Sequence, residues 1–460
     1  MKDDFGDVQR IVLAGDPWEE ARHLVLRFRA HSAPLHFLQL LLKKKHPTAA
    51  SASNAPAVQL SLGFSRRGLQ SARVPAYVLA CFAAKAPAFA AGAALRAASH
   101  GGSAGSDPPA QWDPAFAFLE LDAVLSLHAS DPVLLDDAIA EIQDMATQAA
   151  VQIVSTLPPA QKLPAPAGQQ FVHFGYRDNL SRVGIHGWTE PTEMAKCLEV
   201  SKFAAGEFVL GHPQDSGANP WIAMARQKKA WPEELRSFFR NGSFGVLHQM
   251  EQDVAGFESF VSEAAAAKTM GADEVKAKLC GRTPSGLPLA AASGARPEDD
   301  FDYAKDLKGE ACPFGSHVRR MNPRGGALAH AARSRPLLRR GMPYGPDWQH
   351  PPQNQERGLL GHFFCASIED QFEHLLGQWA DRVPLGSDDG GGARDPLIGA
   401  HEKGDGGFEI PTASGRPIVL RGLHPFTRTR GTAYLFYPSL TTLARIARNE
   451  VFADLREDKA

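Results

Sequence analysis

Paired cysteines are missing from this sequence. Its 460 residues include five cysteines that lie far apart, and no two of them form a C-x-x-C motif. An odd number of scattered cysteines indicates neither a disulfide framework nor a thiolate metal site. The absence of C-x-x-C-H also argues against covalent attachment of a haem. We therefore expect reduced thiols in a cytoplasmic protein; the five are Cys81, Cys197, Cys280, Cys312 and Cys365.

An excess of one charge and a long apolar run are missing as well. Lysine and arginine number 49 against 51 acidic residues, so no global field would recruit nucleic acid or an anionic membrane. The most apolar window, residues 76–95, contains Lys85 and Pro87, which indicates a broken helix rather than a membrane span. The first ten residues carry acids where a secretory signal would be basic. Neither nucleic acid nor a membrane is an expected partner.

Strand and helix patterns recur along the chain. Residues 116–129 are typical of a strand, and residues 132–154 have apolar residues at helical spacing. A strand followed by a long helix is also expected in residues 242–269, in 361–380 and in 432–447. No Gly-rich phosphate loop follows any of these strands. The order favours an α+β fold over a doubly wound parallel sheet.

The length bounds the number of domains. A chain of 460 residues is too long for one ordinary hydrophobic core, so two domains are expected. The two similar α+β patterns divide the chain into residues 1–215 and residues 216–460.

A lone histidine lies in the stretch CPFGSHVRRMNPR, residues 312–324. No second histidine, cysteine or acid stands at ligand spacing from His317, which disfavours zinc. A single protein ligand suits haem, because the porphyrin supplies four nitrogens. The neighbouring Arg319, Arg320 and Arg324 would then suit the haem propionates. A histidine without any ligand role explains the same residues, so both readings stay open here.

The stretch FVHFGYRDNLSR, residues 171–182, places an arginine beside an aspartate at the end of an apolar run. Peroxide cleavage at a haem needs a base that moves a proton and a fixed cation that stabilises developing negative charge. Arginine does not lose its proton in proteins, so Asp178 would be the base. An arginine from another part of the chain would be the cation, and LLRRGMPYG contains two, Arg339 and Arg340. Aspartic acid ionises well below neutral pH, whereas histidine is protonated in mild acid, so this base predicts activity at acidic pH.

With these motifs, the chain resembles the dye-decolorising (DyP-type) haem peroxidase family over most of its length. The family hallmark G-x-x-D-G corresponds to the sequence GYRDN at residues 175–179. Other blocks resemble the family in the same order: GEFVLGHP, NGSFGVLHQMEQDV, LCGRTPSGLPL, CPFGSHVRRMNPR, RRGMPYG, GLLGHFFCASIEDQFE, DPLIG and RGTAYLFYPSL.

The resemblance implies two ferredoxin-like halves with antiparallel sheets and peripheral helices, and one non-covalent haem b per chain held mainly by the second half. It makes His317 the proximal iron ligand, Asp178 the distal acid-base residue and Arg339 the distal arginine, with Arg340 as the neighbour most easily confused with it. It also suggests a propionate contact for Arg319. Hydrogen peroxide and organic donors such as phenols and bulky dyes would be the substrates. A homo-oligomer is left open.

An acid should accept a hydrogen bond from the second ring nitrogen of the proximal histidine. Glu369 and Glu373 are both candidates, and the sequence does not choose between them. Two departures from the family pattern bear on the pocket. Asn179 replaces a glycine, and asparagine is the residue other than glycine that best tolerates a left-handed backbone. Gly361 and His362 replace apolar bulk, which predicts either an enlarged distal cavity or the entry of water.

Several other residues near these motifs have structural explanations. His173 is expected to make a structural hydrogen bond, and Arg177 is expected to be structural. Two functions compete with a peroxidase: a haem-binding or haem-delivery protein with little turnover, and a haem-free α+β interaction module. Four aromatic residues are candidates for relaying electrons, although core packing explains them equally well: Trp231, Trp379, Tyr344 and Tyr434.

Overall fold

The computed structural model describes most of the chain. The described residues are 5–15, 18–29, 32–44, 47–51, 56–97, 107–116, 121–181, 183–197, 199–221, 232–291, 301–324, 335–348, 355–381, 394–401 and 406–450.

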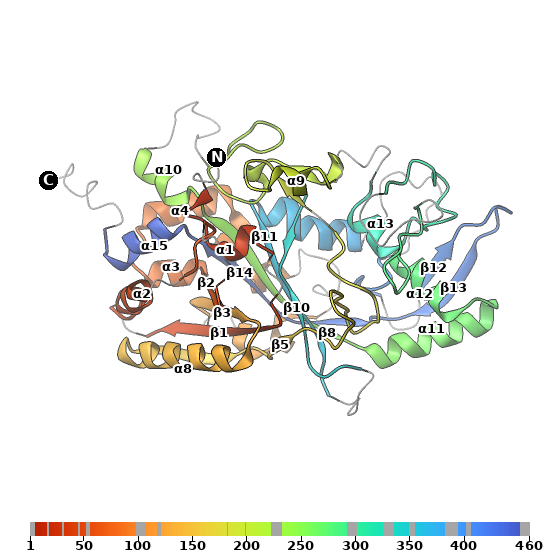
Figure 1. Cartoon of the computed structure of the whole chain (residues 1–460), viewed down its shortest axis with the longest axis horizontal. Helices are drawn as coiled ribbons and strands as arrows, with labels where there is room; N and C mark the ends of the chain where they lie inside the picture. Colours follow the sequence, from red (N-terminus) through yellow and green to blue (C-terminus); the bar gives the residue numbers. More distant parts are fainter. Residues whose placement is uncertain are drawn as a thin grey trace.

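The first half of the chain folds as a ferredoxin-like unit (Figure 1). Its strands pair antiparallel in the order β4-β1-β3-β2, the order of a βαββαβ unit. Helices α2 and α8 pack against this sheet. The elements are β1 (Glu20–Phe28), α2 (Ala33–Lys43), β2 (Val58–Phe64), β3 (Ala123–Ala129), α8 (Pro132–Gln148) and β4 (Val151–Thr156).

The second half repeats the same topology. Its strands pair antiparallel in the order β14-β8-β11-β9, and a helical segment follows both β8 and β11. The predicted α+β class and the two ferredoxin-like halves are therefore confirmed. The elements are β8 (Ser243–Gln252), α11 (Val254–Lys268), β9 (Leu338–Arg339), β11 (Gly358–Cys365), the π-type helices η7 (Ile368–Glu373) and η8 (Leu375–Ala380), and β14 (Thr427–Tyr437).

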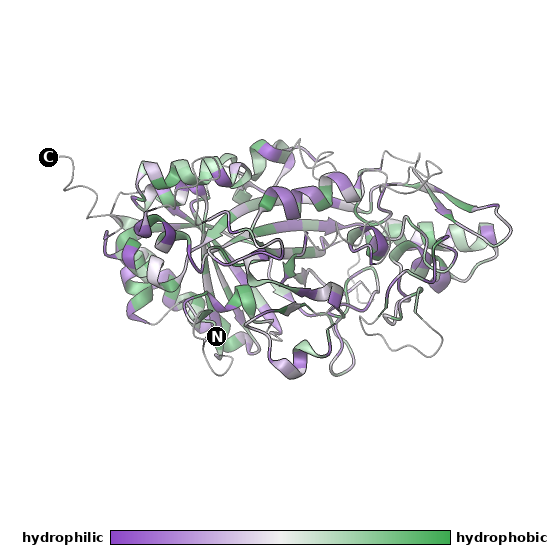
Figure 2. Cartoon of the chain, turned by 90° about the horizontal axis from the view of Figure 1, so that it is seen from above, coloured by the Kyte–Doolittle hydropathy of each residue, from purple (hydrophilic) through white to green (hydrophobic). Residues whose placement is uncertain are grey.

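Both halves contribute to one sheet. Strand β14 pairs with β2 at Phe436 and Phe64, and β10 (Met342–Tyr344) pairs with both β11 and β5 (Ala160–Gln161). The path β10-β5-β1-β3-β2-β14-β8-β11 consequently closes on itself. One hydrophobic core runs through both halves, and the strands in Figure 2 are rich in hydrophobic residues. The domain division at residue 215 stays a prediction.

The inside of this closed ring is polar. The strand registers put His23, His128 and His362 on the inward face, where the ring centroid of His23 lies 5.7 Å from that of His128 and 5.8 Å from that of His362. His23 Nδ1 lies 2.8 Å from Ser126 Oγ, and His362 Nε2 lies 2.8 Å from the hydroxyl of Tyr437. Burial lowers the pKa of His23 to about 3 and that of His128 to about 4. These histidines are therefore neutral at ordinary pH.

A second, smaller core lies at one end of the long axis. It joins α11, α12 (Ala272–Cys280), β12 (Gly406–Ile410) and β13 (Ile418–Leu423), at the right of Figure 1. The short helix α13 (His317–Met321) packs between α12 and η8. This core positions the site described below.

One helix of the first half differs from the expectation, and another region agrees with it. The helix predicted over residues 132–154 ends at Gln148, because residues 151–154 belong to strand β4. Residues 76–95 form the expected broken helix, divided into α4 (Ala76–Lys85), α5 (Pro87–Ala91) and α6 (Ala93–Arg96). Within the described ranges, no helix combines the length and apolarity needed to cross a membrane. All five cysteines are free thiols.

The remaining regular elements surround the two cores. They are α1 (Arg10–Leu13), α3 (Arg66–Ser71), η3 (Pro109–Gln111), η4 (Pro114–Phe116), β6 (Gly184–Ile185), α9 (Pro191–Met194), η5 (Glu199–Ser201), β7 (Lys202–Phe203), η6 (Ala205–Glu207), α10 (Glu233–Phe239) and α15 (Leu440–Ala447).

Candidate functional site

His317 is the first residue of α13, and its imidazole is held by a buried carboxylate. Ring atom Nδ1 lies 2.9 Å from Oδ2 of Asp395, whose side chain is fully buried. The other carboxylate oxygen of Asp395 accepts hydrogen bonds from the backbone N–H groups of Leu397 (2.9 Å) and Ile398 (3.1 Å). The carboxylate is thereby fixed at the start of the short turn DPLIG, residues 395–399.

The charge of Asp395 defines the tautomer of His317. Burial by itself raises the pKa of Asp395, but nearby His317 and Arg320, together with the N–H of Leu397, outweigh burial and lower that pKa. An ionised carboxylate accepts hydrogen bonds and donates none. Nδ1 of His317 therefore carries the proton, and Nε2 is left with its lone pair.

The acid that holds His317 is a correction to the sequence-based expectation. Glu373 binds Arg96 and accepts a hydrogen bond from the hydroxyl of Tyr434 (3.0 Å). Glu369 accepts a hydrogen bond from the backbone N–H of Ala88. Both acids are thus engaged in the first core. Asp395, 78 residues beyond His317, takes the role assigned to them.

The start of α13 is fixed by the preceding loop and by α12. The hydroxyl of Ser316 donates to the carbonyl of Lys278 at 2.6 Å, and Ser316 is completely buried. On the other side, Nε of Arg320 donates to the carbonyl of Trp379 in η8, and the N–H of Asp395 donates to the next carbonyl, that of Ala380. Both of these bonds go to η8, so this helix positions the segments that carry His317 and Asp395.

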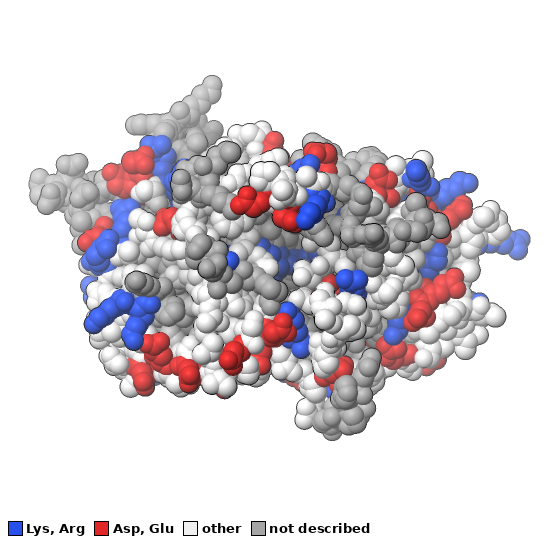
Figure 3. All heavy atoms as spheres, viewed as in Figure 1, with Lys and Arg blue, Asp and Glu red and all other residues white. Residues whose placement is uncertain are grey.

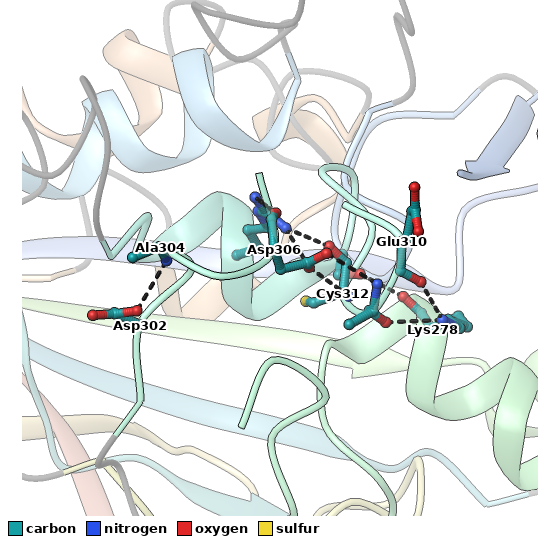
Figure 4. A network of polar contacts seen from close by, with 9 residues as sticks. Lys278, Asp302, Ala304, Asp306, Glu310 and Cys312 are labelled. Atoms are coloured by element: carbon teal, nitrogen blue, oxygen red, sulfur yellow. Dashed lines mark hydrogen bonds and ion pairs between the residues drawn. The ribbon is translucent and has the colours of Figure 1, made fainter. Parts of the chain in front are cut away.

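Arg319 belongs to a polar network with Asp306 and Cys312, two residues that Figure 4 shows close together. Its guanidinium pairs with Asp306 at 2.8 Å and donates to the carbonyl of Cys312 at 2.6 Å. It also lies 4.4 Å from the ring centroids of Tyr303 and Phe314. Asp306 in turn accepts from the backbone N–H groups of residues 311 and 312. These contacts hold the loop before His317, and the propionate contact that the resemblance suggests for Arg319 stays a prediction. Arg320 and Arg324 are buried as well.

Asp178 ends a tight hairpin that is anchored to both cores. Within it, the N–H of Val172 donates to the carbonyl of Tyr176, and Gly175 has a φ of 82°. Phe174 packs on Phe257 of α11 with ring centroids 4.6 Å apart. The predicted structural role of His173 is confirmed, because its Nε2 lies 2.9 Å from the carbonyl of Tyr344 in β10.

The end of the hairpin presents Asp178 at the surface. Arg177 is half-buried, and its N–H donates to the carbonyl of Pro284. Asp178 is exposed, and Asn179 has a φ of 56°. The predicted left-handed backbone after the acid is confirmed. Among the residues that the structure describes, none forms an ion pair or hydrogen bond with the Asp178 carboxylate.

Arg339 shares a face of the sheet with the departure at Gly361 but not with the one at His362. It pairs directly with Phe363 of β11, so both side chains lie on one face, while His362 faces the ring interior. Gly361 lies on the Arg339 face. The Phe363 ring occupies the space that a side chain at this position would take, because a Cβ added to Gly361 would lie 2.5 Å from that ring. The enlargement predicted from these two residues is therefore not seen at Gly361.

Arg339 is exposed, whereas Arg340 reaches the carbonyls of Ile11 and Leu13. Within the described ranges, the Arg339 guanidinium has no carboxylate partner. Arg340 is thus the arginine with a structural role, and Arg339 remains available for an anion. Of the aromatic candidates, Tyr344 and Tyr434 are buried, Trp379 is half-buried, and Trp231 lies outside the described residues.

The donor set at His317 fits a haem iron. No group of three or more His, Cys, Asp or Glu side chains within the described segments could hold a bare metal ion. One imidazole with an available Nε2 and a carboxylate behind it matches the needs of an iron that already has four porphyrin nitrogens.

The fold is shared with DyP-type peroxidases of known structure. The structure of a DyP-type peroxidase of Anabaena sp. aligns with a TM-score of 0.77 and 21% identity, covering 97% of this chain and 95% of that one. A dye-decolorizing peroxidase in complex with 2,6-dimethoxyphenol aligns with a TM-score of 0.78 and 23% identity, covering 96% of this chain and 99% of that one.

Sequence comparison points to the same group. Dye-decolorizing peroxidase msp1 of Mycetinis scorodonius is 26% identical over 432 residues, covering 85% of this chain and 77% of the relative. Multifunctional dye peroxidase DyP2 of an Amycolatopsis species is 27% identical over 307 residues, covering 60% and 61%. No family model matches. The resemblance to the dye-decolorising peroxidases is confirmed.

Proposed function

We propose that this protein is a haem b peroxidase that reduces hydrogen peroxide and oxidises phenols or bulky dyes. The observation that carries the proposal is the pair formed by His317 and Asp395. A buried carboxylate that fixes the histidine tautomer also raises the basicity of the opposite nitrogen, and this suits an axial iron ligand. The names of the relatives and the shared fold support the same reaction.

In this proposal each residue has one task. His317 would hold the haem, and the haem would supply the redox chemistry, in which peroxide takes up two electrons and organic donors return them one at a time. The Asp178 carboxylate takes the proton from one peroxide oxygen and returns it to the other, so that water leaves. The Arg339 guanidinium stabilises the negative charge that develops as the O–O bond breaks. Arg319 enters only as a residue that holds the loop before His317.

Two features of the described residues support these assignments. The Asp178 carboxylate and the Arg339 guanidinium are both exposed side chains without an opposing charge. Their supporting segments also meet at β10: the hairpin that carries Asp178 binds Tyr344 through His173, and β10 follows directly on β9, which carries Arg339. An acid and a cation delivered to one strand from different parts of the chain suit the distal side of a peroxidase.

The haem absorption spectrum tests the proposal. Protein reconstituted with haem should show a Soret band, and His317→Ala should lose it or shift it to the spectrum of weakly held haem. One equivalent of hydrogen peroxide should change the spectrum of the intact protein rapidly. Asp178→Asn and Arg339→Leu should each slow that change at least about a hundredfold while haem content stays the same. Slow bleaching in all variants would favour a haem carrier, and absence of a Soret band would refute haem binding altogether.

A further inference from the structure

A cavity separate from the His317 site lies between elements of the first half of the chain and strand β14 of the second half. Its volume is about 620 Å³, which falls within the range of about 300–1,000 Å³ typical of small-molecule sites. Parts of β1, α3, α5, α6, η4 and β14 surround it. Helices α3 and α4 mark this region at the left of Figure 1. The cavity therefore lies on the opposite side of the molecule from the second core that holds His317.

The inner wall of this cavity is apolar and largely aromatic. Phe28, Phe89 and Phe116 line it together with Leu121, and all four are buried. Several alanines of α5 and α6 complete the wall, so their small side chains leave the space open. A flat ring system would be desolvated between these surfaces.

The opening of the cavity is basic. Arg29, Arg66 and Arg67 line it, and none of the described lining residues is acidic. Arg67 is compensated by buried Asp122, whose Oδ1 lies 3.3 Å from its Nε. Arg29 binds the neutral side chain of Gln152, and Arg66 has no carboxylate partner among the described residues. Among the residues that the structure describes, the guanidinium charges of Arg29 and Arg66 thus have no compensating anion.

These charges are local. The chain as a whole is nearly neutral, and acidic and basic side chains alternate over the face drawn in Figure 3. A carboxylate or sulfonate at the opening would form charge-assisted hydrogen bonds with the guanidinium groups. Its aromatic part would at the same time bury apolar surface against the phenylalanines.

We propose that this cavity is a binding site for an aromatic molecule with one acidic group, such as an aryl sulfonate or aryl carboxylate. The site needs neither haem nor peroxide, so it is independent of the proposed peroxidase reaction. The polar side chains of Ser65 and Gln70 also line the cavity, while the hydroxyl of Tyr434 is bonded to Glu373.

Naphthalene-2-sulfonate is the probe, with binding measured by titration calorimetry on the haem-loaded protein. We expect saturable one-to-one binding, and about tenfold weaker binding in Arg66→Ala because one charge-assisted interaction is lost. The neutral naphthalene-2-sulfonamide should bind more weakly than the sulfonate by a similar factor. Equal affinity for the sulfonate and the sulfonamide would overturn the proposal.

Two tryptophan variants on α6 form the decisive pair. Ala94 lines the cavity, whereas its neighbour Leu95 is 72% exposed and does not. Ala94→Trp should abolish binding by filling the cavity, and Leu95→Trp should leave it unchanged. Circular dichroism would show that both variants fold. Two results would overturn the proposal. One is binding that survives in Ala94→Trp; the other is a shift of the haem absorption on binding, which would place the ligand beside the iron.

Discussion

Nδ1 of His317 and Oδ2 of Asp395 lie 2.9 Å apart, although the two residues are 78 positions apart in the sequence. The carboxylate is completely buried and has a lowered pKa, because His317, Arg320 and a backbone N–H outweigh the effect of burial. It is consequently a fixed negative charge behind the imidazole. This relationship leads to the first of four predictions.

Asp395→Asn should raise the reduction potential of bound haem. Asparagine still accepts a hydrogen bond from Nδ1, but it removes the negative charge that makes His317 electron-rich. Potentiometric titration followed by absorption measures the potential. Glu373→Gln is the control, because Glu373 binds Arg96 and Tyr434 instead of His317, and it should leave the potential unchanged. Equal potentials for Asp395→Asn and the unmodified protein would contradict this role.

The buried histidines of the closed ring should make the fold sensitive to acid. Burial lowers the pKa of His23 to about 3 and of His128 to about 4, from an ordinary value of 6.5. Their stabilising effect is complete above pH 6.5 and is lost as pH falls toward these lowered values, because the unfolded chain binds the protons first. Each histidine should contribute a slope of up to about 1.4 kcal/mol per pH unit in this window.

Urea unfolding at pH 7 and pH 5 tests this dependence. His128→Leu should reduce the loss of unfolding free energy between the two pH values, since neither ring nitrogen of His128 has a hydrogen-bond partner within the described residues. His36→Leu is the matched control, because His36 is exposed on α2. An unchanged pH dependence in His128→Leu would argue against the buried histidine as its source.

Asn179 should tolerate glycine but not alanine. Its φ of 56° lies in the left-handed region, where a residue with a Cβ costs about 1–2 kcal/mol and asparagine is partly exempt. Asn179→Ala should therefore lower the free energy of unfolding by about 1 kcal/mol. Asn179→Gly should be neutral or slightly stabilising. Thermal unfolding compares the two, and equal midpoints would mean that the hairpin relaxes to another conformation.

Gly361→Ala should disturb the face that carries Arg339. The added Cβ would lie 2.5 Å from the Phe363 ring, so the ring must move, and Phe363 pairs with Arg339. We expect a loss of about 1–2 kcal/mol in stability and a slower reaction with peroxide at unchanged haem content. Gly407→Ala is the control, because an added Cβ there meets nothing closer than 3.8 Å. If both variants behave alike, Phe363 does not depend on the glycine.

Local patterns were sufficient for much of the architecture. The strand and helix of residues 243–268 and the final strand and helix lie where alternation and helical periodicity place them. The helix predicted over 132–154 was too long at its C-terminal end. Its last four residues include β-branched Val and Ile, and this segment pairs with β1. Only the partner strand shows that the segment is a strand and not a further helical turn.

The sequence by itself determined the two repeated α+β halves and the left-handed turn at Asn179, because each depends on neighbours within a few residues. Only the tertiary structure decided that Asp395 holds His317, that Arg319 binds Asp306, and that Gly361 is covered by Phe363. Such contacts join segments that are distant along the chain or set by side-chain packing. The packing of α13, η8 and the turn at 395–398 decides which acid reaches the imidazole. No spacing in the sequence encodes that geometry.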